Sequence, residues 1–486
     1  MAENTRKPTL AEALVPITFL IILLSINVTI FGDAALDGSN QMVLILSAAV
    51  AGLLAMRIGV SWKTMQRGIL HSINSALPSI LILLLIGSLA GSWMISGIVP
   101  AMIYYGLKIL NPTILLVASC IICALVSMAT GSSWTTIATV GLALIGIGRA
   151  LGVEEGVIAG AIISGAYFGD KMSPLSDTTN LAPAMAGTDL FTHIRYMTLT
   201  TLPTLGITLA IYLVMGLSYR TGNDIHDIEP ILSALSDTFQ INAWLFVAPL
   251  LVIVLIVMRV PAIPALLAGS LLGIVCAIIF QPHIFHQISG ITDHPIESAY
   301  VASMMALYTK VNIVTGNAIV DELLSTGGMA GMLGTIWLIL SAMVFGGIMD
   351  ASGMLKRIAE VIISVVNSTG SLIASTAASC VFFNITASDQ YLAIVVPGKM
   401  FEKIYKDRGL APENLSRTLE DSGTVTSVLI PWNTCGAAQS NVLGVSTFTY
   451  LPYCFFNIIS PFMTVFYAYA GIKIAKLTRK PEPDID

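Results

Sequence analysis

Two polar segments interrupt the apolar runs of this chain, one in each half. The segment 169–180 reads Gly-Asp-Lys-Met-Ser-Pro-Leu-Ser-Asp-Thr-Thr-Asn, and the segment 420–436 begins Glu-Asp-Ser-Gly and ends Pro-Trp-Asn-Thr-Cys-Gly. The residues on either side of each segment are apolar enough to enter a bilayer. Backbone that leaves the helix at membrane depth is tolerated only where protein or a water-filled cavity satisfies its polar groups. Two such interruptions, one per half, predict a substrate site near the midplane of a secondary transporter.

The composition is that of an integral membrane protein. Of the 486 residues, 55% are hydrophobic and only 10% are charged, whereas soluble domains carry about 25% charged residues. The expected partner is therefore membrane lipid, and the net charge of −5, which is spread over loops, suggests no nucleic-acid partner. No nucleophile with a base to activate it is visible, so we expect a transporter without a cofactor rather than an enzyme.

Apolar segments long enough to cross a bilayer recur along the whole chain. The candidate spans are 11–31, 41–58, 75–96, 112–129, 133–149, 156–186 (broken), 196–217, 243–259, 262–281, 332–350, 371–386, 389–404, 415–440 (broken) and 452–472. Two further segments, 98–110 and 354–366, are too short to cross and are expected to lie along the interface or to enter as half-helices. These segments predict an all-α polytopic membrane protein with about 12–14 spans.

The two halves carry traces of an internal repeat. A shift of 257 residues without gaps superposes Gly152 on Gly409, Pro174 on Pro431, Gly187 on Gly444, Phe191 on Phe448, Thr192 on Thr449, Tyr196 on Tyr453 and Tyr212 on Tyr469. Because these pairs cluster around the interruptions, we interpret them as the remains of a duplication. The predicted units are 1–220 and 243–486, with seven spans each, and an acidic external linker at 221–242 joins them.

The basic residues predict how the two units lie in the membrane. Three clusters are expected to be cytoplasmic by the positive-inside rule, namely Arg57, Lys63 and Arg67; Lys403, Lys406, Arg408 and Arg417; and Lys473, Lys476, Arg479 and Lys480. The loop 146–160, which the shift pairs with the second cluster, has one basic residue, Arg149. Equivalent loops on opposite sides indicate inverted repeats, which many alternating-access carriers share. We expect a multi-pass protein of the inner (plasma) membrane with both termini cytoplasmic.

Ionisable side chains inside spans are costly and mark candidate functional sites. The main set is Asp170, Lys171, Asp177, Asp389, Glu420 and Asp421, whereas Asp350 and Lys399 lie nearer span ends. The neutral residues beside them that we expect to supply oxygen ligands are Ser133, Thr178, Thr386, Asn433 and Thr434. A small hard cation needs about six oxygen ligands, which carboxylate, hydroxyl, amide and freed carbonyl groups can supply together.

Several of these residues also have a structural interpretation. Asp170 and Lys171 are adjacent and can form structural ion pairs, whereas Asp177 can cap a half-helix at 178–185. Asp389 can cap a helix at 390–404. Glu420 directly precedes Asp421, so at most one of these two is expected to face the site squarely. Capping and ion binding are compatible, and both interpretations stay open.

Four motifs resemble the NhaC family of sodium/proton antiporters, which belongs to the ion transporter superfamily. They are Gly-Ser-Ser-Trp-Thr-Thr at 131–136, Gly-Ala-Tyr-Phe-Gly-Asp-Lys-Met-Ser-Pro-Leu-Ser-Asp-Thr-Thr at 165–179, Leu-Leu-Ser-Thr-Gly-Gly at 323–328 and Pro-Trp-Asn-Thr-Cys-Gly at 431–436. The resemblance covers essentially the whole chain and implies inverted repeats, re-entrant hairpins and a homodimer. The tips at 176–178 and 432–434 resemble the sodium-binding Ser-Asn-Thr loops of related dicarboxylate carriers, with Asp in the middle of the first and Trp at the front of the second.

We therefore expect a secondary active transporter that exchanges Na⁺ for H⁺ by alternating access. Desolvation disfavours the free charge of a buried carboxylate. Such a carboxylate is expected to bind either a proton or a sodium ion. The leading carriers are Asp177 and Asp170, followed by Asp389 and Asp421, and Na⁺ is expected at Asp177, Thr178, Asn433 and Thr434. The alternative is a Na⁺- or H⁺-coupled exchanger of small organic acids, of the malate/lactate type, or of amino acids, with Lys171 as the partner of the anion. A channel is not favoured, because nothing resembles a selectivity filter.

Overall fold

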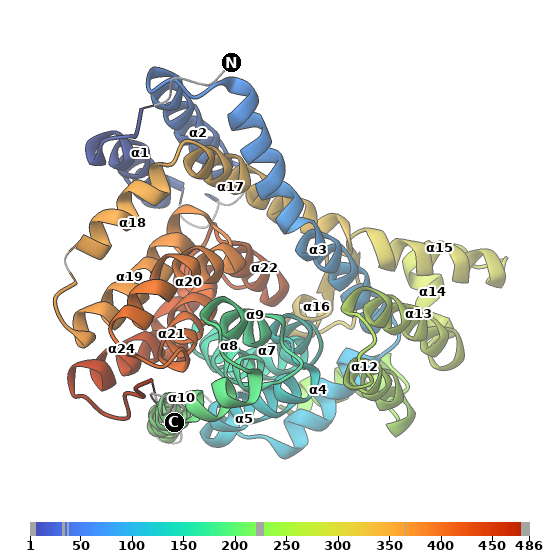
Figure 1. Ribbon diagram of the computed structural model, residues 1–486. Helices are drawn as coiled ribbons and strands as arrows, with labels where there is room; N and C mark the ends of the chain where they lie inside the picture. The colour runs from blue at the N-terminus through green and yellow to red at the C-terminus, as the bar shows by residue number, and fades with distance from the viewer. Residues whose placement is uncertain (1–5, 32–34, 36–37, 220–227, 365, 478–486) are drawn as a thin grey trace.

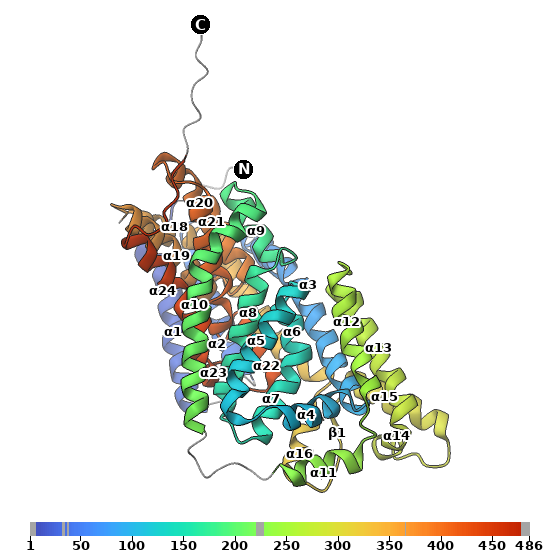
Figure 2. The same ribbon diagram turned by 90° about the horizontal axis from the view of Figure 1, so that it is seen from below.

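The computed structural model describes residues 6–31, 35, 38–219, 228–364 and 366–477, and it is helical almost throughout (Figure 1 and Figure 2). Among these residues, eight helices are long and apolar enough to cross a membrane, or up to ten if each of two bent pairs counts as one span. The one sheet in the described part of the chain is the antiparallel pair of β1 (Val311–Asn312) and β2 (Ser325–Thr326). The prediction of an all-α polytopic membrane protein is confirmed.

The helices of the first half follow the predicted segments closely. They are α1 (Leu10–Phe31), α2 (Ser39–Arg57), α3 (Trp62–Ile95), α4 (Ile98–Ile109), α5 (Pro112–Thr130), α6 (Ser133–Thr136), the π-helical turn η2 (Ile137–Gly141), α7 (Leu142–Ala150), α8 (Glu155–Met172), α9 (Asp177–Ala186) and α10 (Leu190–Tyr219). The predicted break in 156–186 is the gap between α8 and α9. The first part of the predicted linker, 221–227, lies outside the described residues.

The second half begins with helices that the sequence predicts only in part. They are α11 (Glu229–Thr238), the 3₁₀ turn η3 (Ala243–Phe246), α12 (Val247–Val257), α13 (Ala262–Phe280), α14 (Pro282–Ser289), α15 (Pro295–Tyr308), α16 (Ala318–Leu323), η4 (Ala330–Met332) and α17 (Leu333–Ala351). No span is predicted between 282 and 331, where α14, α15 and α16 lie. In Figure 1 the long helix α3 runs diagonally from the group of α2 and α17 to the group of α13 and α15.

The last part of the chain contains the second interruption. Its elements are α18 (Met354–Ser364), α19 (Thr369–Thr386), α20 (Gln390–Asp407), α21 (Glu413–Leu419), the π-helical turn η5 (Glu420–Thr424), η6 (Ser427–Leu429), α22 (Thr434–Leu443), α23 (Thr447–Tyr450), η7 (Leu451–Tyr453) and α24 (Phe455–Tyr469). The predicted broken span 415–440 is thus the succession from α21 to α22. In Figure 2 α4 and α7 lie at one end of the molecule, and α18 and α20 lie at the opposite end.

Close backbone packing holds the C-terminal half of α8 against α5. An added Cβ atom at Gly165 would lie 2.1 Å from the carbonyl oxygen of Cys120, and one at Gly169 would lie 2.3 Å from that of Ala124. Glycines four residues apart lie on one helix face, and small residues at this spacing let membrane helices approach closely. The α8 helix is therefore held against α5 immediately before Asp170, which places this carboxylate beside the end of α5.

Backbone conformations also recur at positions that are 257 residues apart. Residues related by the shift share left-handed φ angles, with Gly131 at +70° and Ser388 at +59°, Gly152 at +70° and Gly409 at +67°, and Gly187 at +78° and Gly444 at +65°. Helix caps recur as well, because Ser132 and Asp389 are N-caps, as are Ser176 and Asn433. Local geometry that recurs at a fixed spacing supports the duplication. The boundaries of the two units stay a prediction.

Candidate functional site

A cavity of about 710 Å³ lies where the interrupted helices of both halves begin. Within the described part of the chain, the first turns of α6, α9, α20 and α22 form part of its lining. The lining residues from these turns and from the loops before them include Ser132, Trp134, Thr135, Ser176, Asp177, Thr178, Gln390, Tyr391, Thr434 and Cys435. The rest of the lining includes residues of α3, the start of α10 and the turn between α12 and α13, where Arg259 lies. A helix N-terminus carries unpaired N–H groups and a partial positive charge. The cavity therefore combines polar backbone, hydroxyl groups and the carboxylates of Asp170 and Asp177 with one arginine, Arg259.

Asp170 is the most deeply held carboxylate of this cavity. It is 8% exposed and lines the cavity from the last turn of α8. Its Oδ2 atom accepts hydrogen bonds from the backbone N–H of Ser133, at 3.0 Å, and from the Ser133 hydroxyl, at 2.6 Å. Two donors on one oxygen at the start of a helix stabilise the ionised form of a carboxylate. The geometry thus presents a charged oxygen ligand to the cavity.

Asp177 lies at the same cavity but has a different role from the predicted cap. The helix α9 begins at Asp177, and its N-cap is Ser176, whose side chain accepts from the N–H of Thr179. The capping interpretation of Asp177 is therefore wrong by one residue. Asp177 is exposed, and its Oδ2 atom accepts a long hydrogen bond of 3.4 Å from the Tyr391 hydroxyl. That contact joins the two halves across the cavity.

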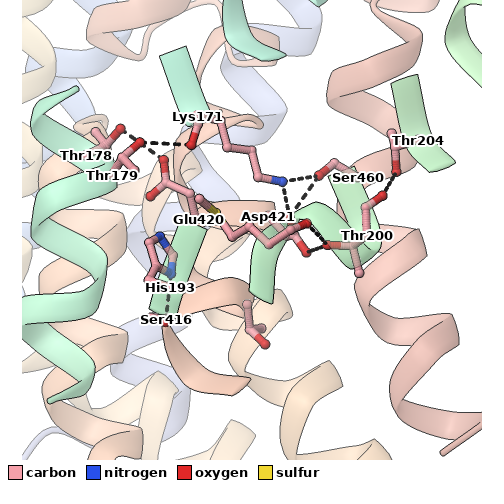
Figure 3. A network of polar contacts seen from close by, with 12 residues as sticks. Lys171, Thr178, Thr179, His193, Thr200, Thr204, Ser416, Glu420, Asp421 and Ser460 are labelled. Carbon is pink, nitrogen blue, oxygen red and sulfur yellow. Dashed lines mark hydrogen bonds and ion pairs between the residues drawn. The ribbon is translucent and has the colours of Figure 1, made fainter. Parts of the chain in front are cut away.

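Lys171 is buried in an ion pair that links the two halves. Its ammonium group donates to Asp421 Oδ1 and to the Ser460 hydroxyl at 3.3 Å, and both charged side chains are fully buried (Figure 3). Asp421 Oδ2 accepts from the Thr200 hydroxyl at 2.9 Å. Lys171 thus forms a structural ion pair, as one interpretation of the sequence expects, but its partner is Asp421, 250 residues away, and not the adjacent Asp170. Lys171 is also not among the residues that line the cavity, so its ammonium group is directed to Asp421 and not to an anion there.

Two of the predicted site residues in the second half, Asp389 and Asn433, are helix caps. Asp389 accepts from the N–H of Leu392 at 3.0 Å, which confirms its predicted capping role. Asn433 caps α22 by accepting from the N–H of Cys435 and donates to Asn384. The Thr386 hydroxyl donates to a carbonyl of its own helix, that of Phe382, at 2.8 Å. Of the predicted site residues in this half, only Thr434 lines the cavity in the described structure.

Sequence reasoning did not select three residues that the structure brings to the site. Gln390 and Tyr391 line the cavity, and the 257-residue shift relates Tyr391 to Trp134, which lines it from the first half. The 257-residue shift pairs Ser133 with Gln390 and Trp134 with Tyr391, so this signal in the sequence could have identified Gln390 and Tyr391. The third is Glu420, which the sequence places among the ionisable residues of the spans but not among the expected ligands. Its side chain is fully buried, and its Oε1 atom accepts a hydrogen bond of 3.0 Å from Thr178 (Figure 3). Glu420 and Asp421 are both buried and contact different partners, and neither lines the cavity itself, which agrees with the expectation that at most one faces it.

Comparisons with known proteins agree with a transport site. A family model described as the Na⁺/H⁺ antiporter family matches residues 165–472. The chain is 37% identical to the Na⁺/H⁺ antiporter NhaC of Alkalihalophilus pseudofirmus, over 96% of this chain and 97% of that protein. It is also 37% identical to the malate-2H⁺/Na⁺-lactate antiporter of Bacillus subtilis, over 96% of each chain. The arginine/ornithine antiporter ArcD of Halobacterium salinarum is 34% identical over 99% of this chain and 96% of that protein.

Proposed function

The chain belongs to the Na⁺/H⁺ antiporter family, and we propose that it is a secondary active transporter that exchanges sodium ions for protons by alternating access. The observation that carries this proposal is Asp170, a carboxylate held at the cavity where the broken helices of both halves begin. Such breaks at membrane depth mark the ion sites of transporters built from repeats.

The lining of the cavity supports a site for one small cation. A sodium ion prefers oxygen ligands, and Asp170, Asp177, Thr178 and Thr434 offer carboxylate and hydroxyl oxygens around one cavity. An ionised carboxylate is costly to carry across the apolar interior. A bound sodium ion or a proton removes that cost, so the site can change sides when either is present. This requirement couples the two fluxes in opposite directions.

We also propose that the two halves are inverted relative to each other, that both termini are cytoplasmic in the inner membrane, and that the protein forms a homodimer. The positions of α7 and α20 at opposite ends of the molecule support the inversion (Figure 2). The basic residues that line the pocket between the first described residues and α18, namely Arg6, Lys7, Lys356 and Arg357, support a cytoplasmic N-terminus by the positive-inside rule.

The inversion predicts opposite labelling of two equivalent loops. Glu154 follows α7, Lys406 lies near the end of α20, and both side chains are exposed. Five of the six native cysteines are buried, so replacing the half-buried Cys276 with alanine leaves only buried native cysteines and keeps background labelling low. We expect a membrane-impermeant maleimide added outside intact cells to label Glu154→Cys and to leave Lys406→Cys unlabelled until the cells are permeabilised. Labelling of both from the same side would contradict the inversion.

A second candidate function is the coupled exchange of a small organic solute. The size of the cavity favours it, because about 710 Å³ is far more than one ion occupies and falls in the usual range of small-molecule pockets. Trp134 and Tyr391 supply aromatic surface, and four helix N-termini favour a carboxylate group. The names of two relatives include organic solutes, namely malate and lactate in one and arginine and ornithine in the other.

Vesicles that contain the purified protein distinguish the two functions. A sodium pulse outside should make the lumen alkaline when no organic solute is present, as sodium enters and protons leave. Malate, lactate, arginine and ornithine are then added singly on one side. Exchange that starts only when one of these solutes is supplied would replace the first function with the second.

A further inference from the structure

Glu420 is separated from the cavity by a single side chain. It begins the π-helical turn η5, is fully buried, and accepts its hydrogen bond from the Thr178 hydroxyl. Thr178 itself lines the cavity. Figure 3 shows the Glu420 carboxyl group directed toward Thr178, whereas Asp421 is directed toward Lys171 and Thr200. The Thr178 hydroxyl is therefore a polar link between the cavity and Glu420.

The second oxygen of this carboxyl group is unsatisfied. Glu420 Oε2 has no partner at hydrogen-bond distance among the residues that the structure describes. The hydroxyl of Thr424, one turn later, likewise has none, although it lies close enough to act on the Glu420 carboxyl group. An ionised carboxylate with an unpaired oxygen in a membrane interior is costly, by several kcal/mol. A proton on Glu420 removes the charge and thus most of this cost.

The charges around Glu420 leave room for one more cation. Lys171 is paired with Asp421, so these two side chains together carry no net charge, although Lys171 also lies close enough to act on Glu420. Arg417, three residues earlier, is also fully buried, and none of its guanidinium nitrogens has a hydrogen-bond partner among the described residues. Its guanidinium group lies over the ring of Tyr196, 4.5 Å from the centroid, and makes no ion pair with Glu420 there. When Glu420 is ionised, the buried cluster of Lys171, Asp421 and Glu420 lacks one positive charge.

The other titratable groups near Glu420 do not supply that charge. His193 on α10 bonds through Nδ1 to Ser416, one turn before Glu420, at 2.8 Å, and its Nε2 atom has no partner in the described structure. A charged imidazolium there would bury an unpaired N–H group, which is costly. Cys380 on α19 and Asp170 on α8 add only negative charge when they ionise. The packed faces of α20 and α24 present Ala393, Ile394, Asn457 and Ser460 to this region.

We propose that Glu420 is the proton-binding site of the exchange and that Asp170 is a separate sodium-binding site. This inference rests on the proposed function and assigns its two cargoes to two carboxylates. A sodium ion at Asp170 and the Thr178 oxygen places a positive charge next to Glu420, which then releases its proton through Thr178 to the cavity. When sodium leaves, the cluster again lacks a positive charge and Glu420 takes up a proton.

Glu420→Gln separates the two roles, because glutamine keeps the shape and the acceptor for Thr178 but binds no proton. We expect exchange of radioactive sodium for sodium, measured in sodium-loaded vesicles, to persist and to become insensitive to acidification in the neutral range. Sodium-driven proton flux should fall at least about 100-fold, the usual scale for loss of a positioned proton carrier. Glu413→Gln, at the partly exposed start of α21, is the matched control and should leave both fluxes unchanged.

A second pair of variants decides the question if Glu420→Gln does not fold. Thr178→Val removes the hydroxyl link and should slow proton flux more than sodium-for-sodium exchange, whereas Thr178→Ser should restore both. Equal losses of the two fluxes in Thr178→Val would contradict the inference. So would wild-type proton flux in Glu420→Gln, or loss of its sodium exchange with the protein still monodisperse. Absence of sodium-driven proton flux in the wild type would instead overturn the proposed function.

Discussion

Asp170→Asn is expected to abolish sodium-driven proton flux while the protein still folds. Asparagine keeps an oxygen that can accept from Ser133 but carries no charge, so the cavity loses the carboxylate that Ser133 holds in place. A charged ligand contributes roughly 3 kcal/mol, and each 1.4 kcal/mol is about tenfold in affinity. We therefore expect sodium affinity to fall about 100-fold. The measurements are radioactive sodium binding to purified protein and sodium-driven alkalinisation of vesicles.

The control for this prediction is Asp189→Asn. Asp189 is exposed in the loop between α9 and α10, where it accepts from the N–H of Thr192, so it lies outside the cavity. We expect this variant to transport at the wild-type rate. Sodium binding in Asp170→Asn equal to that of the wild type would show that the ion binds elsewhere.

Lys171→Met is expected to produce the largest loss of stability among single substitutions at the site. It leaves the Asp421 carboxylate, which is fully buried, without its counter-charge. Breaking a buried ion pair from one side costs about 3–5 kcal/mol. We expect little folded protein after extraction in mild detergent and a much lower unfolding temperature in a thiol-reactive dye assay that follows exposure of the buried cysteines.

The same pair provides its own rescue. Lys171→Met with Asp421→Asn removes both charges and should recover most of the lost stability, because the penalty of Lys171→Met comes mainly from the unpaired charge. Lys399→Met replaces an exposed lysine on α20 and should have no effect. Equal instability of the single and double variants would mean that packing, rather than charge, holds this region together.

The sequence predicts where the helices break but not which carboxylates meet. The segments before Asp177 and Asn433 are polar, rich in turn formers and related by the repeat, so local chemistry reveals both breaks. The partner of Lys171 could not be predicted, because Asp421 lies in the other half and only tertiary packing brings the two together. The sequence places the N-cap of α9 one residue late, at Asp177 instead of Ser176, because serine and aspartate are equally good N-cap residues.

Two adjacent carboxylates show a further limit of sequence reasoning. Neighbours on a regular α-helix point in different directions, so at most one of Glu420 and Asp421 is expected to face the site squarely, and neither of them lines the cavity. Both begin a π-helical turn that is surrounded by α9, α10 and α24. Because the surroundings bury every side of this turn, each carboxylate finds its own partner. Such turns often mark functional sites, but their position does not follow from local residue preferences.

Sodium-driven proton flux in vesicles that contain only the purified protein is the most direct test of the proposed exchange. Sodium chloride is added outside, a pH-sensitive dye reports the lumen, and no organic acid or amino acid is present. The exchange of sodium for protons predicts that the lumen becomes alkaline with wild-type protein and stays unchanged with Asp170→Asn. A lumen that stays unchanged with folded wild-type protein, or becomes equally alkaline with Asp170→Asn, would contradict it.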